Sequence, residues 1–406
     1  MTDEQGRPPP TEPPADRKRP LPETTADRKR PLPETTADRK RPLLETTDEP
    51  TLGYDEQGRP PPWTRHDNRR WVVGDPGRQP AIRARVPRMF RTPPPDIVID
   101  GAEAGRLTFR ATSVRGAGHQ ERGEPRQDAY AVRFTRDQRW LAGCVADGVS
   151  AAKRSHEAAA VICEIVAQSL IDHLVAYPPP PGASGWAAEL PWSPTVTAAN
   201  DAVTDLARPF LTKATTATTL TFEQVRAVMS ATALAFAVET EPAPNGGHRA
   251  MLANLSGDSA AFLLTGGAWL PLTAVKNDGA AIFSSGVRSL PADVRVAPNA
   301  FYLFPGQVLL VMTDGLGDPF GSGAGSVADF LRTRWAAPPD PLAFAQQVAF
   351  LRKSFTDDRT AVVLWPAPPA DRDTARKPGP HPDDQDTGPD ADVRDTARQP
   401  GPDADE

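Results

Sequence analysis

The sequence contains little cysteine, no long apolar run and no strong excess of charge of either sign. Its 406 residues include only two cysteines, Cys144 and Cys163, which excludes a small disulfide-stabilised scaffold and favours reduced thiols over a disulfide. The net charge of −6 gives no indication of nucleic acid or an anionic membrane surface as a partner. No stretch approaches the apolar length that a membrane span requires, and the N-terminus lacks the segments of a secretion signal. These absences predict a cytoplasmic protein that binds neither nucleic acid nor membrane.

Proline, in contrast, is abundant, with 47 residues that gather toward both ends of the chain. An eleven-residue repeat rich in charge and proline runs through 15–25, 26–36 and 37–47. Such a sequence has too little apolar surface to form a core, and it favours an extended, solvated chain. Its threonines lie beside basic runs and could be phosphorylated, although a plain low-complexity linker explains the same pattern more simply.

Composition divides the chain into four parts. Residues 1–62 and 367–406 are predicted to be disordered tails, the first of them carrying the repeats. Residues 63–104 are predicted to form a partly ordered arm, because tryptophans are scattered there among arginines and prolines. Only residues 105–366 have the apolar periodicity of a globular domain.

Within this domain the apolar pattern changes between the periods of strands and helices. Strands are predicted at 107–114, 129–134, 141–146, 231–239, 251–255, 260–264, 269–272, 301–303, 308–312 and 361–365. Helices are predicted at 156–177, 194–213, 330–335 and 342–355. Because strands outnumber helices and short turns join most of them, the predicted fold class is α+β with antiparallel sheet.

Five aspartates lie beside glycine or another turn-forming residue at the ends of predicted strands. They are Asp128, Asp147, Asp258, Asp314 and Asp357. Each could be an ordinary turn aspartate, but carboxylates that gathered at one buried edge would repel one another strongly. A hard divalent cation, which prefers oxygen ligands, removes that repulsion. The pattern therefore predicts a metal site.

The five motifs around these aspartates also occur in a specific order. They read Gln127-Asp128-Ala129, Ala146-Asp147-Gly148, Gly257-Asp258-Ser259, Thr313-Asp314-Gly315 and Asp357-Asp358-Arg359-Thr360. One such triplet is weak evidence, whereas five in order are specific. In this order the chain resembles the metal-dependent protein serine/threonine phosphatases of the PPM or type 2C family, bacterial branch, over roughly residues 105–366.

The resemblance implies a fold and an activity. The fold would be a four-layer αββα sandwich, in which two antiparallel sheets pack face to face and helices flank them. The activity would be hydrolysis of phosphoserine and phosphothreonine esters on proteins by a water that bridges two Mn²⁺ or Mg²⁺ ions. The partners would be phosphoprotein substrates, the targets of a serine/threonine kinase.

The resemblance also implies roles for the aspartates. Asp147 would bridge both ions, with the carbonyl of Gly148 as a further ligand, and Asp314 and Asp357 would complete the second site. Asp128 would hold metal-bound water, and Asp258 would match the ligand of a third, weaker ion. Asp358 competes with Asp357 for one role, and the register of the motif favours Asp357.

Phosphate recognition departs from the family pattern, because no arginine lies at the customary spacing before the first aspartate. Arg122 or Arg126 could bind the phosphate instead, since a guanidinium can make a bidentate contact with it. His119 is a candidate for protonating the leaving oxygen. All three side chains could also be solvated residues of a surface loop. The alternative function is therefore a catalytically weak or inactive binding or regulatory module with the phosphatase fold.

Overall fold

The computed structural model describes residues 63–66, 70–89, 92–183, 185–211, 219–274 and 289–367. All the elements below belong to one compact unit, 54–406. The tails predicted at 1–62 and 367–406, apart from Ala367, lie outside the described residues.

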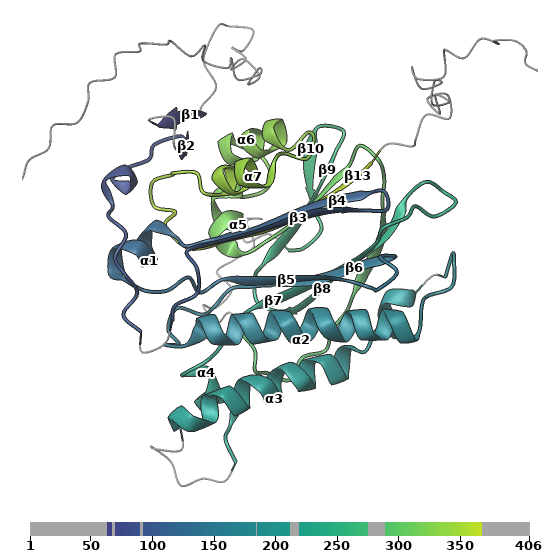
Figure 1. The fold of residues 1–406 in the computed structure, drawn as a ribbon, viewed down its shortest axis with the longest axis horizontal. Helices are drawn as coiled ribbons and strands as arrows, with labels where there is room; N and C mark the ends of the chain where they lie inside the picture. Colours follow the sequence, from purple (N-terminus) through teal and green to yellow (C-terminus); the bar gives the residue numbers. More distant parts are fainter. Residues whose placement is uncertain are drawn as a thin grey trace, which may run out of the picture. The chain divides into compact units, whose positions relative to one another are not determined.

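Two antiparallel sheets form the centre of this unit (Figure 1). The six-stranded sheet has the order β10 (Ala268–Pro271), β9 (Ala260–Thr265), β12 (Val308–Met312), β13 (Arg359–Pro366), β4 (Leu107–Val114) and β3 (Ile97–Ala104). The five-stranded sheet has the order β11 (Asn299–Leu303), β8 (His248–Ser256), β7 (Ala233–Glu239), β6 (Trp140–Ala146) and β5 (Ala129–Phe134). All neighbouring strands pair antiparallel, which confirms the predicted α+β class.

Helices cover the outer face of each sheet (Figure 1). The five-stranded sheet is covered by α2 (Ser155–Ala176) and α3 (Trp192–Leu211), with the short α4 (Phe222–Arg226) against α3. The six-stranded sheet is covered by α5 (Asp314–Phe320), α6 (Ser326–Arg334) and α7 (Pro341–Val348). The result is the predicted four-layer αββα sandwich.

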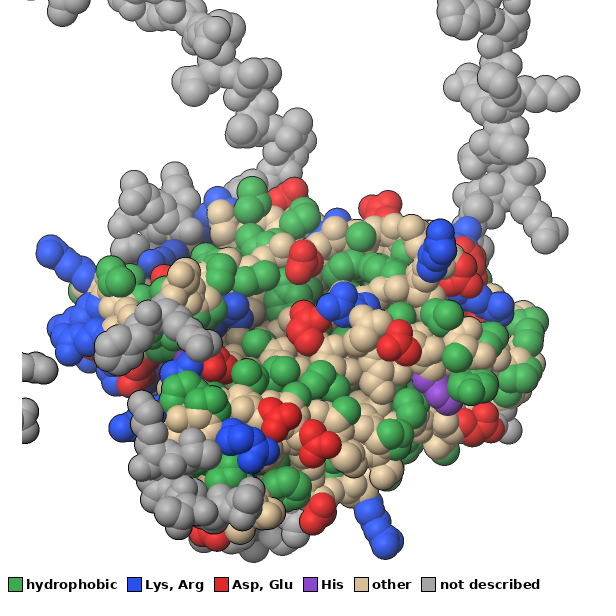
Figure 2. Space-filling view, turned by 60° about the horizontal axis from the view of Figure 1, so that its bottom comes forward, with side chains coloured by type: hydrophobic (Ala, Val, Ile, Leu, Met, Phe, Trp, Pro, Cys, Tyr) green, Lys and Arg blue, Asp and Glu red, His purple; other side chains and the backbone are tan. Residues whose placement is uncertain are grey.

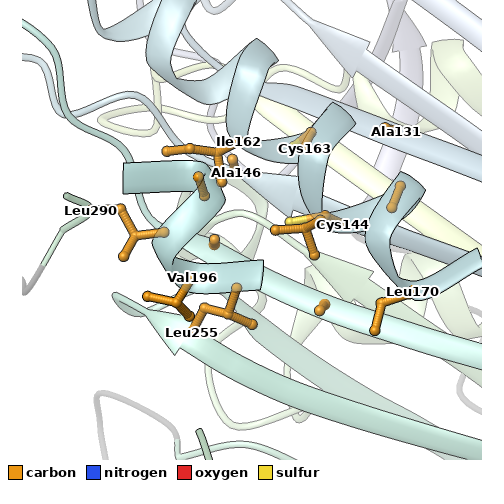
Figure 3. Close-up of a cluster of buried hydrophobic side chains, with 14 of the residues drawn as sticks. Ala131, Cys144, Ala146, Ile162, Cys163, Leu170, Val196, Leu255 and Leu290 are labelled. Carbon is orange, nitrogen blue, oxygen red and sulfur yellow. The ribbon is translucent and has the colours of Figure 1, made fainter. Parts of the chain in front are cut away.

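Three apolar layers separate the four structural layers, and strand β6 contributes to two of them. Trp140 and Cys144 point into the layer shared with α2 and α3, whereas Leu141 and Val145 point between the sheets. This alternation follows from the two-residue period of a strand. Cys163 of α2 lies in the same apolar layer as Cys144 (Figure 3). Both cysteines are free and buried, on the strand and the helix that the sequence predicts.

Helix α2 is the longest helix in the described part of the chain. It ends at Ala176, just before the four prolines 178–181, which cannot continue a helix. By length and composition it is the one described helix that could cross a membrane, although the sequence predicted no such segment. Its apolar side chains pack on the five-stranded sheet, and 50% of its most apolar window is buried.

Several elements differ from the sequence prediction. Helix α7 ends at Val348 instead of 355, because the carbonyls of Val348 and Phe350 are bound by the guanidinium of Arg359. Helices α1 (Ala117–Arg122) and α5 were not predicted, since both are short and contain glycine. Helix α3 was predicted to reach Lys213, which lies outside the described residues.

Part of the predicted arm belongs to the sandwich. Residues 97–104 form β3, which pairs with β4 along its whole length. Most of β3 is exposed at the sheet edge, so it lacks the apolar alternation that predicts a strand. Before it, β1 (Trp63–His66) and β2 (Arg70–Val73) form a hairpin, and Trp63 and Trp71 pack on Phe330 of α6.

Candidate active site

Strand register brings two of the aspartates together in the five-stranded sheet. Ala129 at the start of β5 is opposite Ala146 at the end of β6. Asp128 and Asp147 are the next residues outward on the paired strands. They must therefore lie side by side at one edge of the sheet.

The six-stranded sheet brings its own aspartates to the same edge. Met312, at the end of β12, is opposite Ala361 of β13 on one side and Ala260 of β9 on the other. Asp314 follows β12, Asp357 precedes β13, and Asp258 precedes β9. All three side chains therefore start from the same end of this sheet.

The electrostatic surroundings of Asp147 include aspartates from both sheets. Burial and the charge of Asp314 raise the pKa of Asp147 to about 8, and Asp357 and Asp258 add to the effect. A hydrogen bond with Asp128 lowers the pKa of Asp147, but by less than these effects raise it. Burial, followed by the charge of Asp147, also raises the pKa of Asp128 well above its usual value. All five aspartates thus contribute to one field of negative charge.

Asp128 is held by two threonines, one in a strand of the opposite sheet and one directly after another strand of that sheet. Its Oδ2 atom accepts hydrogen bonds from Oγ1 of Thr313 at 2.6 Å and from Oγ1 of Thr360 at 2.9 Å. Thr313 directly precedes Asp314, and Thr360 belongs to β13. These threonines were not among the residues predicted for the site, although each belongs to one of the five motifs.

Two motif glycines are required by close backbone contacts. A Cβ atom on Gly315 would lie 1.8 Å from the carbonyl oxygen of Asp358, and one on Gly148 would lie 2.7 Å from that of Gln127. No other residue type leaves room for the neighbouring chain at these points. The glycines therefore allow the loops to approach closely enough for the aspartates to converge. The carbonyl of Gly148 as a metal ligand stays a prediction.

Asp357 and Asp358 have different surroundings. The side chain of Asp357 is 50% exposed and faces a pocket, whereas that of Asp358 is 1% exposed. Asp358 accepts backbone hydrogen bonds from Gly116 at 2.6 Å and Gln127 at 2.5 Å. Asp358 thus connects the loop before β5 to the start of β13, which leaves Asp357 as the carboxylate available in the pocket.

His119 lies on α1 between these two carboxylates. Its Nδ1 atom is 2.8 Å from Oδ1 of Asp358, close enough for an ion pair although off the hydrogen-bond direction. Its Nε2 atom is 3.8 Å from Oδ1 of Asp357 and 3.7 Å from Oε2 of Glu124. Burial alone would lower the pKa of His119, but contact with Asp358 and the charge of Asp357 outweigh it and raise the pKa.

The two candidate arginines point in different directions. Arg126 is buried and donates hydrogen bonds to the carbonyl of Pro95 at 3.0 Å, to Ser113 Oγ at 2.7 Å and to the carbonyl of Asp128. Arg122 is 55% exposed, lines the pocket and pairs with Glu124 at 2.7 Å. The geometry therefore favours Arg122 as the residue that can reach a phosphate, and Arg126 as a support for the loop.

The pocket has a volume of about 240 Å³. Its lining residues are His119, Arg122, Ser150, Asp314, Gly315, Asp318, Ser354, Phe355, Thr356 and Asp357. Asp318 was missed by the sequence analysis, although its position four residues after Asp314 on a helix places both on one face. A larger pocket of about 530 Å³ lies at the opposite ends of the strands, near Glu239 and Arg249, away from the aspartates.

The donor set fits hard divalent cations. The converging ligand atoms are carboxylate oxygens, and cysteine and histidine are absent from the five strand-end motifs. Such a set suits Mg²⁺ or Mn²⁺ better than metals that prefer nitrogen or sulfur. Buried carboxylates with raised pKa values are also the groups whose charge a bound cation would offset.

A family model described as Protein phosphatase 2C matches residues 115–352, more than half of the chain. The chain belongs to the protein phosphatase 2C family. This match begins at Arg115, directly after β4, and ends before Asp357. Members of this family are metal-dependent protein serine/threonine phosphatases, and their cofactors are Mg²⁺ or Mn²⁺.

Two solved structures of serine/threonine phosphatases resemble this chain at low identity. A serine/threonine phosphatase of S. agalactiae is 15% identical, with 66% of this chain and 99% of that chain covered and a TM-score of 0.44. The phosphatase PstP/Ppp of Mycobacterium tuberculosis is 20% identical, with coverages of 64% and 99% and a TM-score of 0.41. These resemblances carry no argument about activity. No curated protein is similar enough to be matched to the sequence.

We expect the metal-free phosphatase to lose stability as pH rises. The folded pKa of Asp147 is about 8 against an ordinary value of 3.8. The folded state therefore binds this proton more tightly than the unfolded state, and its contribution to the free energy of unfolding is lost as pH rises toward 8. Between about pH 5 and about pH 8 the melting temperature should fall by roughly 4 °C or more.

Thermal scans with and without saturating Mn²⁺ would test this expectation. Bound cations offset the carboxylate charge and stabilise the folded state by mass action, so the scans with Mn²⁺ should show little decline over the same pH range. A metal-free melting temperature that rose with pH, or that Mn²⁺ left unchanged, would contradict the expectation.

Proposed function

We propose that this chain hydrolyses phosphoserine and phosphothreonine esters on proteins in a reaction that requires Mn²⁺ or Mg²⁺. The observation that carries the proposal is the convergence of the five strand-end aspartates around Asp147, whose pKa is raised to about 8. Carboxylates in such a position are costly for the fold unless cations neutralise them. Membership of the phosphatase 2C family supports the same activity.

The metal ligands would come from both sheets. Asp147 would contact both ions, with the Gly148 carbonyl on one of them, and Asp314 and Asp357 would complete the set. Asp128 would orient water at the site, and Asp258 would serve a third, weaker ion. When bound, two such ions supply an activated water nucleophile and offset the charge of the phosphoryl group.

Two side chains from α1 would act on the substrate. Arg122 would bind the phosphate oxygens through its guanidinium, since it lines the pocket and is half exposed. His119 would donate a proton from Nε2 to the leaving serine or threonine oxygen. Its raised pKa favours the protonated form that a general acid needs. Asp358, against Nδ1, would keep the ring in this orientation.

Basic side chains beside α1 also suit an anionic substrate. Arg83, Arg85 and Arg88 are exposed, and the backbone N–H groups of Arg85 and Arg88 bond to carbonyls of Gln120 and Gly123. Lys and Arg side chains gather at the left of Figure 2, the side on which α1 lies in Figure 1. Such a cluster attracts phosphorylated segments over a distance of about a Debye length.

The composition and the family resemblance support a proposal about the cellular setting. We propose a bacterial, cytoplasmic enzyme that reverses the action of a serine/threonine kinase. Two reduced cysteines, both buried, fit a reducing compartment.

A non-catalytic binding module is the alternative. It is favoured by the lack of an arginine at the customary spacing and by the bulky, charged residues 149–156 after Asp147. Such a module would hold a phosphorylated segment without releasing phosphate.

Release of phosphate from a phosphothreonine peptide by the full-length chain tests the proposal. We expect steady turnover with millimolar Mn²⁺, loss of turnover with a chelator, and recovery when Mn²⁺ is restored. The full chain is needed because a fragment that begins at 105 would lack β3. Peptide binding without release of phosphate would replace the enzyme with the binding module.

A further inference from the structure

The described residues before β3, which are 63–66, 70–89 and 92–96 and are hereafter called the arm, are attached to the loop that presents Asp357. This loop, residues 349–356 and hereafter the ligand loop, runs from the end of α7 to Asp357. The backbone N–H of Leu351 donates to the carbonyl of Trp71 at 2.7 Å, and the N–H of Val73 donates to the carbonyl of Leu351 at 3.0 Å. The N–H of Lys353 donates to the carbonyl of Asp75 at 2.6 Å. The arm therefore lies beside the ligand loop as a short additional strand.

Gln79 makes the most specific contact between the arm and the ligand loop. Its side-chain amide is 4% exposed and donates to the carbonyls of Arg352 and Phe355, the latter at 3.3 Å. Its Oε1 atom accepts from the backbone N–H of Arg352 at 3.4 Å. One buried side chain thus binds both ends of a four-residue turn that stops two residues before Asp357.

The ligand loop needs such support because its backbone is not relaxed. Ser354 has a φ of 69°, a left-handed conformation that residues other than glycine, asparagine and aspartate rarely adopt. From the interior, Arg359 donates to the carbonyl of Phe355 at 2.9 Å and to that of Val348 at 3.2 Å. Gln79 holds the same loop from the other side, so the turn is fixed between β13 and the arm.

The arm also contacts the opposite wall of the pocket. Arg115 donates from Nη2 to the carbonyl of Arg85 at 2.9 Å and to that of His119 at 3.0 Å. The arm therefore touches both α1, which carries His119, and the ligand loop. The arm itself lies outside residues 115–352, which match the family model, so it is an addition to the matched region.

We propose that the arm positions Asp357 for metal binding and that Gln79 is the residue through which it does so. The proposal depends on the proposed function, because it takes Asp357 as a metal ligand. Gln79 touches no reacting group and is a positioning residue. Without the hydrogen bonds of Gln79 the ligand loop would adopt several conformations. Part of the free energy of metal binding would then be used to restore the one conformation that places Asp357 at the metal site, and the metal affinity would fall.

The variant Gln79→Met tests the proposal in the full-length protein. Methionine has a similar length and tolerates burial but lacks both amide hydrogen bonds. We expect Mn²⁺ affinity, measured by calorimetry, to fall roughly 10-fold. In the metal-free protein, amide hydrogen exchange in residues 350–356 should become about tenfold faster or more. At saturating Mn²⁺, kcat should return to near the wild-type value.

Arg78→Ala is the matched control. Arg78 is the neighbouring arm residue and pairs with Glu121 at 2.7 Å on the surface, where its side chain is 76% exposed. Such an exposed pair contributes little, so this variant should bind Mn²⁺ as the wild type does. Unchanged Mn²⁺ affinity and hydrogen exchange in Gln79→Met would overturn the positioning role alone. A wild-type chain that bound no Mn²⁺ would overturn the proposed function as well.

Discussion

Replacing Asp147 with asparagine should lower kcat on any phosphoester by about 1,000-fold or more. Asp147 occupies the centre of the carboxylate cluster, where Asp314, Asp357 and Asp258 all affect its charge. The neutral amide would remove the ligand proposed to contact both ions, and each 1.4 kcal/mol of lost transition-state stabilisation is about a tenfold loss in rate. Phosphate release from a phosphothreonine peptide at saturating Mn²⁺ measures the effect, and Asp314→Asn should behave alike.

Asp205→Asn is a suitable control, because Asp205 is 73% exposed on α3. This helix belongs to an outer layer of the sandwich and carries none of the five aspartates. The Asp205→Asn variant should keep wild-type activity. The metal-free Asp147→Asn protein should melt no lower than the wild type, since the substitution removes a buried carboxyl group whose ionised form the fold disfavours. Equal activity of wild type and Asp147→Asn would rule out the proposed metal centre.

His119→Gln should separate substrates by their leaving groups. Serine and threonine alkoxides are poor leaving groups and need a proton, whereas p-nitrophenolate does not. Loss of a general acid costs roughly 100-fold or more in such a step. We therefore expect kcat on a phosphothreonine peptide to fall by roughly 100-fold, while kcat on p-nitrophenyl phosphate changes little.

The p-nitrophenyl phosphate reaction also reports whether the variant is folded and loaded with metal. His173→Gln, in the last turn of α2, is the control for loss of a histidine elsewhere. An equal loss on both substrates would mean that His119 supports the structure of the site, through Asp358, without protonating the leaving oxygen.

Strand ends were the informative part of the sequence. Buried runs such as 308–312 predict strands, and an aspartate within two residues of the end of such a run has to lie at the edge of a sheet. Register then brings Asp128 and Asp147 to one edge of the five-stranded sheet and Asp314 and Asp357 to one edge of the six-stranded sheet. The packing of the sheets places these two edges together, as the hydrogen bonds from Thr313 and Thr360 to Asp128 show. The antiparallel four-layer fold and the meeting of the aspartates could therefore be predicted from the sequence and from the family resemblance.

The contacts that support the aspartates could not be predicted. Asp358 bonds to Gly116 and Gln127, and Gln79 bonds to Arg352, across more than 200 residues in each case. No local pattern marks such pairs, because they depend on how loops pack after the sheets have formed. From the sequence, Arg122 and Arg126 were equally good candidates for binding phosphate. The structure distinguishes them, because Arg126 is buried beneath the loop and bonds to Ser113.

The hydroxyls of Thr313 and Thr360, which donate to Asp128, have a consequence for divergence within this fold. Asp128 directly precedes β5 of one sheet, whereas Thr360 lies in β13 of the other sheet and Thr313 directly follows β12 of that sheet, so the catalytic edge also joins the two sheets of the sandwich. A descendant that abandoned hydrolysis would not be free to discard Asp128. It would retain the remnant of an active site as part of its framework, long after the chemistry had gone.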